Sequence, residues 1–263
     1  APSQTFHITP DVDDDVNYAV LYKNGVEYDR TACNDGDTAT FSNLEKGSYT
    51  VYMMKNWESR YEYSGNTFSI TNSFFILDGQ TAYENLSAAV AAIPSGGSGV
   101  ITVEGGTYIG SANFNVVISD KNVTIMPKDS LDPVIFSSDF YQNYLFWVEG
   151  HAQLTMEDIT MTGKFTTVAL LFYKCNQVCT VSNCEFKNIK YKDPIRVVDA
   201  NLVLEGDTFE STGAIELLGN TVAKIDDCTF TSNFNHDINA EGGAIVAYGS
   251  SDLTITNSKF TMN

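Results

Sequence analysis

The sequence predicts an all-β protein in which a small N-terminal β-sandwich precedes a right-handed parallel β-helix with an N-terminal capping helix. Three observations support this prediction: short β-forming segments separated by turns near the start, one amphipathic segment at about 81–93, and an octapeptide repeat in the second half of the chain. The predicted domains are the sandwich over 1–72 and the β-helix over 73–263, with the helix at about 81–93 as its cap.

The predicted sandwich consists of short strands separated by turn residues. Tyr18–Tyr22 and Tyr49–Tyr52 are rich in β-forming residues, and Asn24-Gly25 is a typical hairpin turn. Several strands at this spacing are typical of a small sandwich. The segment 39–51 resembles the F-x-x-L-x-x-G-x-Y-x-V hairpin of immunoglobulin-like and transthyretin-like domains of surface proteins. This resemblance implies an immunoglobulin-like domain over 1–72 and says nothing about a ligand.

The segment from Thr81 to Ile93 has a different pattern. Tyr83, Leu86, Val90 and Ile93 recur at helical spacing among alanines, and a proline follows them. We expect this helix to cover the open edge of the first coil, which would otherwise be free to pair with another chain.

An octapeptide repeat determines the predicted fold of the second domain. Five segments align without gaps: 154–161, 179–186, 202–209, 223–230 and 253–260. Counted back from the last residue of each segment, positions −7, −5 and 0 are apolar or small, and position −3 is Asp, Asn, Gly, Asp and Asn in turn. The segments end at residues 161, 186, 209, 230 and 260, so the periods are 25, 23, 21 and 30 residues.

The parity of these positions predicts a corner. Positions −7 and −5 share one face of a strand and positions −2 and 0 share another, so the odd step between them requires the chain to turn. Asn, Asp and Gly at position −3 tolerate such a turn, including a positive φ. Periods of this length fit single coils of a parallel β-helix, in which neighbouring strands stack at ~4.8 Å.

The β-helical part also resembles known families. The Gly106-Thr107-Tyr108 turn after the helix is similar to the opening of the pectin-lyase-like superfamily. The segments 241–245 (EGGAI) and 257–263 (NSKFTMN) resemble the "GGAI … F-x-x-N" repeats of polymorphic outer-membrane proteins. They also resemble the adhesin-like β-helix proteins of methanogenic archaea, which often join immunoglobulin-like domains to such helices. The resemblance covers about 75–263 and implies a cell-surface or secreted adhesin.

The charge of the chain limits its partners. Asp and Glu number 33 against 15 Lys and Arg, a formal net charge of −18. Such a field repels nucleic acid, and no basic stripe compensates for it. No apolar run reaches the ~18 residues of a membrane span, so we expect no direct membrane insertion. The start at Ala1 suggests a mature or trimmed end, and we expect further coils and a surface anchor beyond Asn263.

A catalytic site is weakly indicated. A β-helix lyase needs carboxylates for Ca²⁺ and a base, and a β-helix hydrolase needs paired carboxylates. Asp226-Asp227 is the obvious pair, but it occupies the corner positions −4 and −3 of the repeat. Arg196 and His236-Asp237 belong to no recognisable signature. We therefore expect no enzyme, no cofactor and no metal site, with a β-helical polysaccharide lyase or glycoside hydrolase as the alternative.

Four of the five cysteines lie in the predicted β-helix. Cys184 and Cys228 both occupy position −2, with the coil of Asp207 between them. Two coil steps are ~9.6 Å, beyond the ~7 Å Cα limit of a disulfide, so we expect buried, reduced thiols. Cys175 and Cys179 form the only close pair, for which a structural role and a local disulfide both stay open.

Aromatic residues supply the candidate ligand-binding site. Trp57, Tyr61 and Tyr63 alternate with polar residues near a predicted sandwich edge, and Tyr141 and Tyr144 fall in a predicted polar loop. Such rings commonly hold sugar faces or protein partners, although packing within the core or between domains is the alternative. The expected partners are other cell surfaces, glycans or surface proteins.

Overall fold

The computed structural model divides the chain into two compact units, Ala1–Asn72 and Ser73–Asn263. It describes residues 4–7, 18–23, 25–32, 38–41, 47–55, 59–70, 74–189, 192–234 and 242–263. In these ranges no helix is long and apolar enough to cross a membrane.

The first unit is built from antiparallel strands, as predicted for a small β domain. A four-stranded sheet has the order β3-β2-β5-β6 and a two-stranded sheet pairs β1 with β4. Their bounds are β1 Gln4–His7, β2 Tyr18–Lys23, β3 Val26–Ala32, β4 Thr38–Phe41, β5 Gly47–Lys55 and β6 Ser59–Ile70. The two ends of the 39–51 motif do not form the expected hairpin, because β4 pairs with β1 whereas β5 pairs with β2 and β6. Phe41, Tyr49 and Val51 are all buried, so the motif connects two sheets and packs its ends in the interior.

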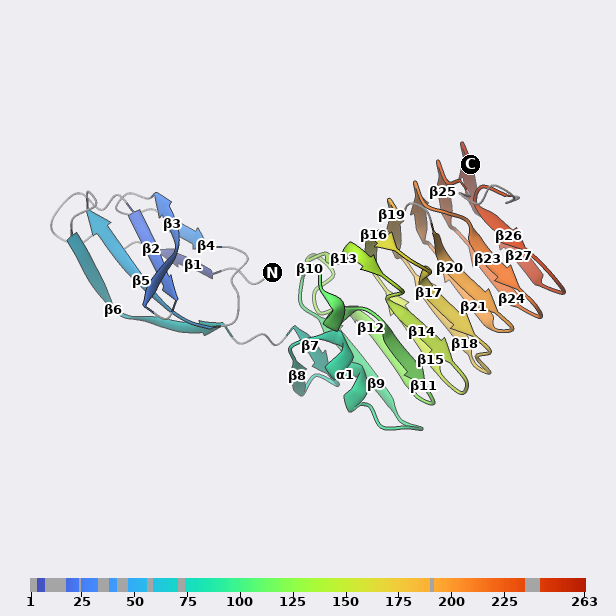
Figure 1. The fold of residues 1–263 in the computed structure, drawn as a ribbon, viewed down its shortest axis with the longest axis horizontal. Helices are drawn as coiled ribbons and strands as arrows, with labels where there is room; N and C mark the ends of the chain where they lie inside the picture. Colours follow the sequence, from blue (N-terminus) through green and yellow to red (C-terminus); the bar gives the residue numbers. More distant parts are fainter. Residues whose placement is uncertain are drawn as a thin grey trace. The chain divides into compact units, whose positions relative to one another are not determined.

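The second unit winds round three sheets, to which successive coils add one parallel strand each (Figure 1). The seven-stranded sheet contains β10 Gly106–Tyr108, β13 Val134–Gln142, β16 Ile159–Phe165, β19 Glu185–Lys187, β22 Thr208–Glu210, β25 Thr229–Thr231 and β28 Lys259–Thr261. The six-stranded sheet contains β11 Val116–Ser119, β14 Phe146–Glu149, β17 Val168–Tyr173, β20 Asp193–Val198, β23 Ile215–Leu218 and β26 Ile245–Ala247. The nine-stranded sheet contains β27 Asp252–Thr256, β24 Val222–Asp226, β21 Asn201–Glu205, β18 Val178–Ser182, β15 Gln153–Glu157, β12 Asn122–Pro127, β9 Ser98–Val103, β7 Phe75–Leu77 and β8 Thr81–Tyr83.

The strand register confirms the gap-free repeat. In the nine-stranded sheet, position −7 of one coil pairs with position −7 of the next, as Cys179 does with Leu202 and Ala223 with Leu253. In the seven-stranded sheet, position 0 does the same from Met161 to Phe260. The rings of Phe186, Phe209, Phe230 and Phe260 form one stack, with centroids 4.6, 4.8 and 4.7 Å apart and planes within 10°.

Position −3 forms the predicted corner with a positive φ in all five repeats. The φ values are 54° for Asp158, 52° for Asn183, 70° for Gly206, 53° for Asp227 and 51° for Asn257. Gly206 has a second constraint, because a Cβ atom there would lie 2.6 Å from Asn183 Oδ1. The corner therefore selects these residue types by backbone conformation and by the space left between coils.

Asp227→Asn is expected to change the free energy of unfolding by less than about 0.5 kcal/mol, because Asn183 and Asn257 hold the same corner in other coils. Asp227→Val is expected to cost about 1–2 kcal/mol, since a β-branched side chain is strained at positive φ. Urea denaturation of both variants measures the difference. Equal losses for Asn and Val would contradict a conformational role for this corner.

The capping helix is shorter than predicted. Helix α1 spans Leu86–Ala92 rather than 81–93, because Thr81–Tyr83 pairs with β7 as strand β8 and Asn85 then caps the helix. The Asn85 side chain accepts a hydrogen bond from the Ala88 N–H at 2.9 Å.

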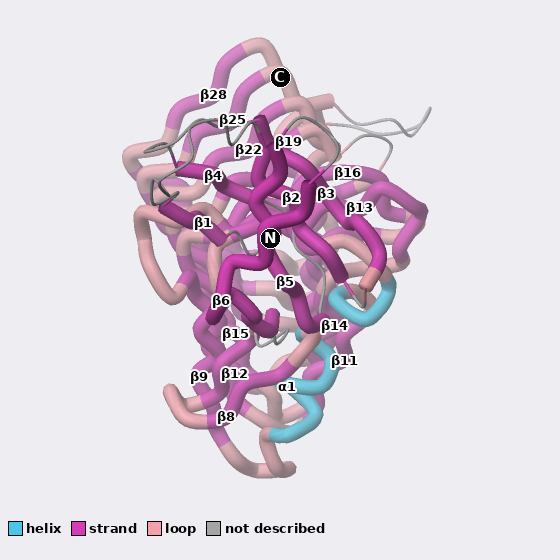
Figure 2. The backbone as a smooth tube through the Cα atoms, turned by 90° about the vertical axis from the view of Figure 1, so that its left-hand side faces the viewer, coloured by secondary structure: helices cyan, strands magenta, loops and turns pink. Residues whose placement is uncertain are grey.

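The open edges of the first coil are covered in two ways. Strand β7 pairs antiparallel with β9 and so satisfies the edge of the nine-stranded sheet. Helix α1 contacts β7, β8, the short 3₁₀ helix η1 (Ser111–Asn113) and β11, which is the terminal strand of the six-stranded sheet (Figure 2). The helix therefore lies at the end of that sheet, as expected, and its buried residues Leu86, Ala89 and Val90 close the end of the hydrophobic core.

Cysteines 175, 179, 184 and 228 are buried free thiols, as predicted for Cys184 and Cys228. Between these two lies the coil of Asp207, whose Oδ1 accepts a hydrogen bond from the Cys184 N–H at 2.7 Å. Cys33 lies outside the described residues.

Candidate ligand-binding face

The outer faces of two of the three β-helix sheets carry mainly small polar side chains, with scattered β-branched apolar ones. In register across the nine-stranded sheet, the outward residues of one row are Val100, Thr124, Thr155, Thr180, Val203, Lys224 and Thr254. Val178 and Val222 of the neighbouring row are also exposed. The corresponding row of the seven-stranded sheet is Thr107, Ile135, Thr160, Glu185, Thr208, Thr229 and Lys259. Small polar and charged side chains are what a solvated sheet surface favours.

The six-stranded sheet differs from both. One outward row, in register, is Val117, Trp147, Leu171, Arg196 and Glu216. The neighbouring row is Ser119, Glu149, Tyr173, Val198 and Leu218. We call these two rows, together with Tyr144 and Asp193, the six-stranded face. Of these rows, those of the six-stranded sheet are the ones that contain aromatic rings, and aromatic rings that gather on one outer face mark a candidate interaction surface.

Aromatic rings form one part of this face. The Trp147 ring meets Tyr144 at 5.8 Å between centroids and 87°, and meets Tyr173 at 6.3 Å and 84°. Phe146 and Val148 are buried in the core on either side of Trp147, so strand alternation directs the indole outward. We call Tyr144, Trp147 and Tyr173 the aromatic cluster. Such edge-to-face contacts hold the rings in fixed orientations.

The aromatic cluster is partly shielded from solvent. Burial, and then the charge of Glu149, raise the pKa of Tyr144. The Trp147 indole N–H is buried and has no hydrogen-bond partner within the part of the chain that the structure describes. The Lys174 ammonium lies 5.1 Å from the centroid of the Tyr173 ring. One ring face of this cluster is therefore already in contact with a cation.

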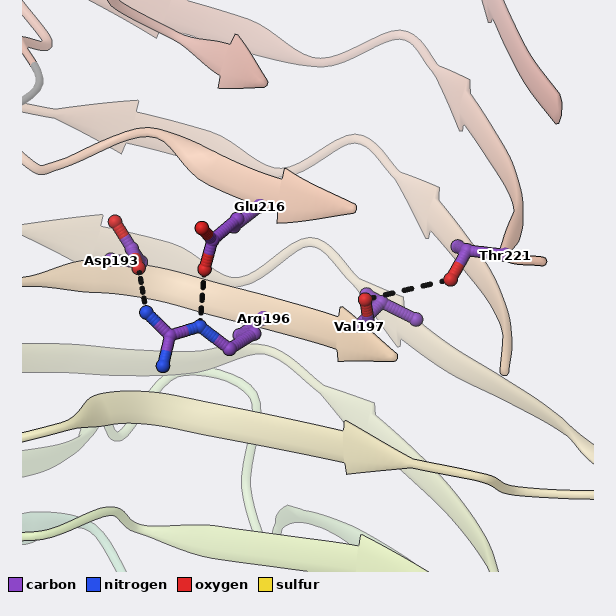
Figure 3. A network of polar contacts seen from close by, with 5 residues as sticks. All are labelled: Asp193, Arg196, Val197, Glu216 and Thr221. Carbon is purple, nitrogen blue, oxygen red and sulfur yellow. Dashed lines mark hydrogen bonds and ion pairs between the residues drawn. The ribbon is translucent and has the colours of Figure 1, made fainter. Parts of the chain in front are cut away.

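An ion network forms the other part of the face (Figure 3). Arg196 on β20 donates from Nη2 to Asp193 Oδ2 at 2.8 Å, and from Nε to Glu216 Oε2 on the next coil. We call Asp193, Arg196 and Glu216 the ion triad. All three side chains are partly buried. A guanidinium held by two carboxylates is fixed in direction as well as in charge.

The pKa of one carboxyl group in the ion triad, that of Asp193, is shifted. Burial, and then the negative charge of Glu216, raise the pKa of Asp193 to about 6, while Arg196 acts in the opposite direction. Asp193 is therefore close to half protonated in mildly acidic solution and ionised at neutral pH.

The predicted site residues fall in different places. Tyr144 belongs to the aromatic cluster, whereas Trp57 and the side chains of Tyr61, Tyr63 and Tyr141 lie outside the described part of the structure. The backbone of Tyr141 belongs to strand β13, so its predicted place in a loop is wrong. Strand β13 extends as far as Gln142 because Gln142 pairs with Phe165 of the next coil.

Sequence reasoning missed Trp147, Tyr173 and the two carboxylates of the ion triad. The available signal was strand parity, because Trp147 stands between two core residues and Tyr173 follows buried Phe172. Aligning the strands that lie outside the octapeptide repeat would have placed Trp147 and Tyr173 on one face.

The expected catalytic candidates have structural roles where they are described. Asp226 Oδ1 accepts hydrogen bonds from Thr256 Oγ1 at 2.7 Å and Asn257 Nδ2 at 2.8 Å, and these bonds lower its pKa. Asp227 forms the corner, and His236 and Asp237 lie outside the described residues. Among the residues that are described, no three His, Cys, Asp or Glu side chains form a group suited to a metal ion.

Comparison with known proteins agrees with this architecture. The family model for the right handed beta helix region matches residues 144–263, which include strands β14 to β28. No curated protein and no solved structure matches the chain. The family match and the parallel sheets together identify the second unit as a right-handed parallel β-helix.

Proposed function

We propose that this protein is a non-catalytic adhesin of the cell surface or of the secreted fraction, which binds glycans of other cells through the six-stranded face. The observation that supports the proposal best is the aromatic cluster, because among the described residues the corresponding rows of the other two sheets carry threonine, valine, isoleucine and charged side chains but no aromatic ring. Sugar rings expose apolar C–H faces, which pack against the π-faces and edges of Tyr and Trp while hydroxyl groups bind nearby polar side chains.

The surroundings of Asp226 and Asp227, the predicted catalytic candidates, support a non-catalytic role. A glycosidase needs one carboxylic acid that stays protonated and a second carboxylate as base or nucleophile. The pKa of Asp226 is lowered, and Asp227 occupies a corner that asparagine fills in other coils. Both residues therefore fit the requirements of the repeat better than those of proton transfer.

A glycoside hydrolase or polysaccharide lyase is the second candidate, and one observation favours it. Asp193 has a raised pKa of about 6 and lies with Glu216 on the outer face of the helix, where a polysaccharide could reach both. In this case Asp193 would be the general acid. Turnover of any polysaccharide that disappears in Asp193→Asn would support catalysis and contradict the adhesin.

Trp147→Ala is expected to weaken glycan or cell attachment by about 1–3 kcal/mol, roughly 5- to 150-fold in Kd, because it removes the central ring of the cluster. Binding of the full chain to a glycan array and to cells, followed by titration of the best ligand, measures the change. Thr180→Ala is the control, since Thr180 faces outward on the nine-stranded sheet. Equal binding of the two variants would place the site elsewhere.

A further inference from the structure

We infer that the six-stranded face binds an uncharged oligosaccharide. The ring of one sugar residue packs on the aromatic cluster, and the hydroxyl groups of a second sugar residue bind the ion triad. The inference rests on the proposed glycan-binding function and names the ligand class. It predicts that uronates and other anionic glycans are poor ligands of this face.

The charges of the six-stranded face balance one another. Arg196 is the cation that belongs to this face, and it is already paired with both Asp193 and Glu216. Two exposed lysines lie beside the face, Lys174 at the Tyr173 ring and Lys192 next to Asp193. With Arg196 they supply three positive charges, against the three negative charges of Asp193, Glu216 and Glu149. The face therefore carries no excess of positive charge, and the whole chain carries −18. A uronate would have to separate an existing ion pair without any long-range attraction to compensate.

The ion triad has polar atoms that are left for a ligand. Within the described part of the chain, Arg196 Nη1, Asp193 Oδ1 and Glu216 Oε1 make no hydrogen bond. The triad thus offers one donor on Arg196 and two carboxylate acceptors, all held in place by the ion pairs. A hydroxyl group both donates and accepts, so sugar hydroxyls can bind to both kinds of group. A carboxylate only accepts, and would leave both triad carboxylates without a donor.

The aromatic cluster and the ion triad lie on different coils. Trp147, Leu171 and Arg196 are register partners on three consecutive strands. Strands in a sheet lie ~4.8 Å apart, so the backbones of Trp147 and Arg196 are separated by ~9.6 Å along the helix axis. A single sugar ring is narrower than this spacing. A chain of two or more sugars that runs along the axis contacts the aromatic cluster and the ion triad together.

The experiment titrates the full chain at neutral pH with soluble mannan, β-glucan and galactan oligosaccharides and with polygalacturonate and alginate oligosaccharides. We expect at least one neutral series to bind, with the tetrasaccharide at least 10-fold tighter than the monosaccharide, and the uronates to bind at least 10-fold more weakly. Arg196→Lys keeps the charge but cannot hold both carboxylates, and is expected to weaken neutral binding about 10-fold.

Two further variants make the result interpretable. Glu216→Gln removes one negative charge without removing the Arg196–Asp193 pair, and is expected to improve uronate binding several-fold. Glu210→Gln is the matched control on the exposed surface of β22 and is expected to change neither ligand class. Circular dichroism of each variant establishes that the β-helix is intact.

The outcomes separate this inference from the proposed function. Preferential binding of uronates that is lost in Trp147→Ala would overturn the neutral ligand and keep the adhesive face. Equal neutral binding by Arg196→Lys and Glu210→Gln would overturn the role of the ion triad. Failure of cells and of all glycans to bind the wild-type chain would overturn the proposed function itself.

Discussion

Replacing Phe209 by alanine is expected to lower the free energy of unfolding by about 3–5 kcal/mol. Phe209 is buried and stacked between Phe186 and Phe230, with centroids 4.6 and 4.8 Å away. The strand register fixes the spacing of these rings, so the neighbouring coils cannot close the space that the substitution leaves. Urea denaturation followed by circular dichroism measures the loss.

Two controls test whether burial in the stack causes this loss. Phe260→Ala removes a ring of the same stack that is 45% exposed, so the loss is expected to be about half as large or less. Glu210→Ala changes an exposed residue on the same strand as Phe209 and is expected to stay within about 0.5 kcal/mol. A loss for Phe209→Ala no larger than that for Phe260→Ala would contradict a core built on this stack.

The stability of the protein is expected to fall as the pH rises towards 8, because of Asp207. Its side chain is fully buried, and its two oxygens accept hydrogen bonds from the N–H groups of Cys184 and Glu205. Burial raises the pKa of Asp207 to about 8, opposed by these two hydrogen bonds. In the unfolded chain the pKa of an aspartic acid is about 3.9.

The direction of this change in stability with pH follows from the number of protons that the folded and unfolded states bind. Between about pH 4 and pH 8 the folded protein holds a proton on Asp207 that the unfolded chain has released. The stabilisation is therefore complete below about pH 4 and is lost as the pH rises to about 8, with a slope of up to about 1.4 kcal/mol per pH unit. Asp193, whose pKa is about 6, acts in the same direction over the lower part of this range.

Denaturation at pH 6 and at pH 8 isolates the contribution of Asp207, and Asp207→Asn is the control. The wild type is expected to lose about 2–3 kcal/mol between these two values, and the variant to lose much less. An equal loss in both proteins, or a wild type that is more stable at pH 8, would show that Asp207 is ionised when buried.

The β-helical coils were predictable because the repeat obeys two physical constraints at once. Strand parity required a corner between positions −5 and −2, and few residue types accept the positive φ observed at Asp158, Asn183 and their equivalents. The helix at 81–93 was predicted less well. The apolar spacing of Tyr83 suits a helix, but the pairing of Thr81–Tyr83 with β7 overrides that local preference.

The candidate site was only partly predictable. Tyr144 was predicted as a site residue from its residue type. The outward orientation of Trp147 and Tyr173, by contrast, depends on packing in strands outside the octapeptide repeat. Arg196 and Glu216 are 20 residues apart in the chain, and only the register of β20 with β23 brings them together. No local pattern in the sequence encodes that contact.

The most direct test of an adhesive β-helix incubates the full chain with neutral and uronate polysaccharides, with and without Ca²⁺, and measures bound protein and new chain ends in the same samples. We predict that the protein is retained on at least one polysaccharide, with no increase in reducing or unsaturated ends. An increase in either kind of end that depends on the protein would contradict it and identify an enzyme.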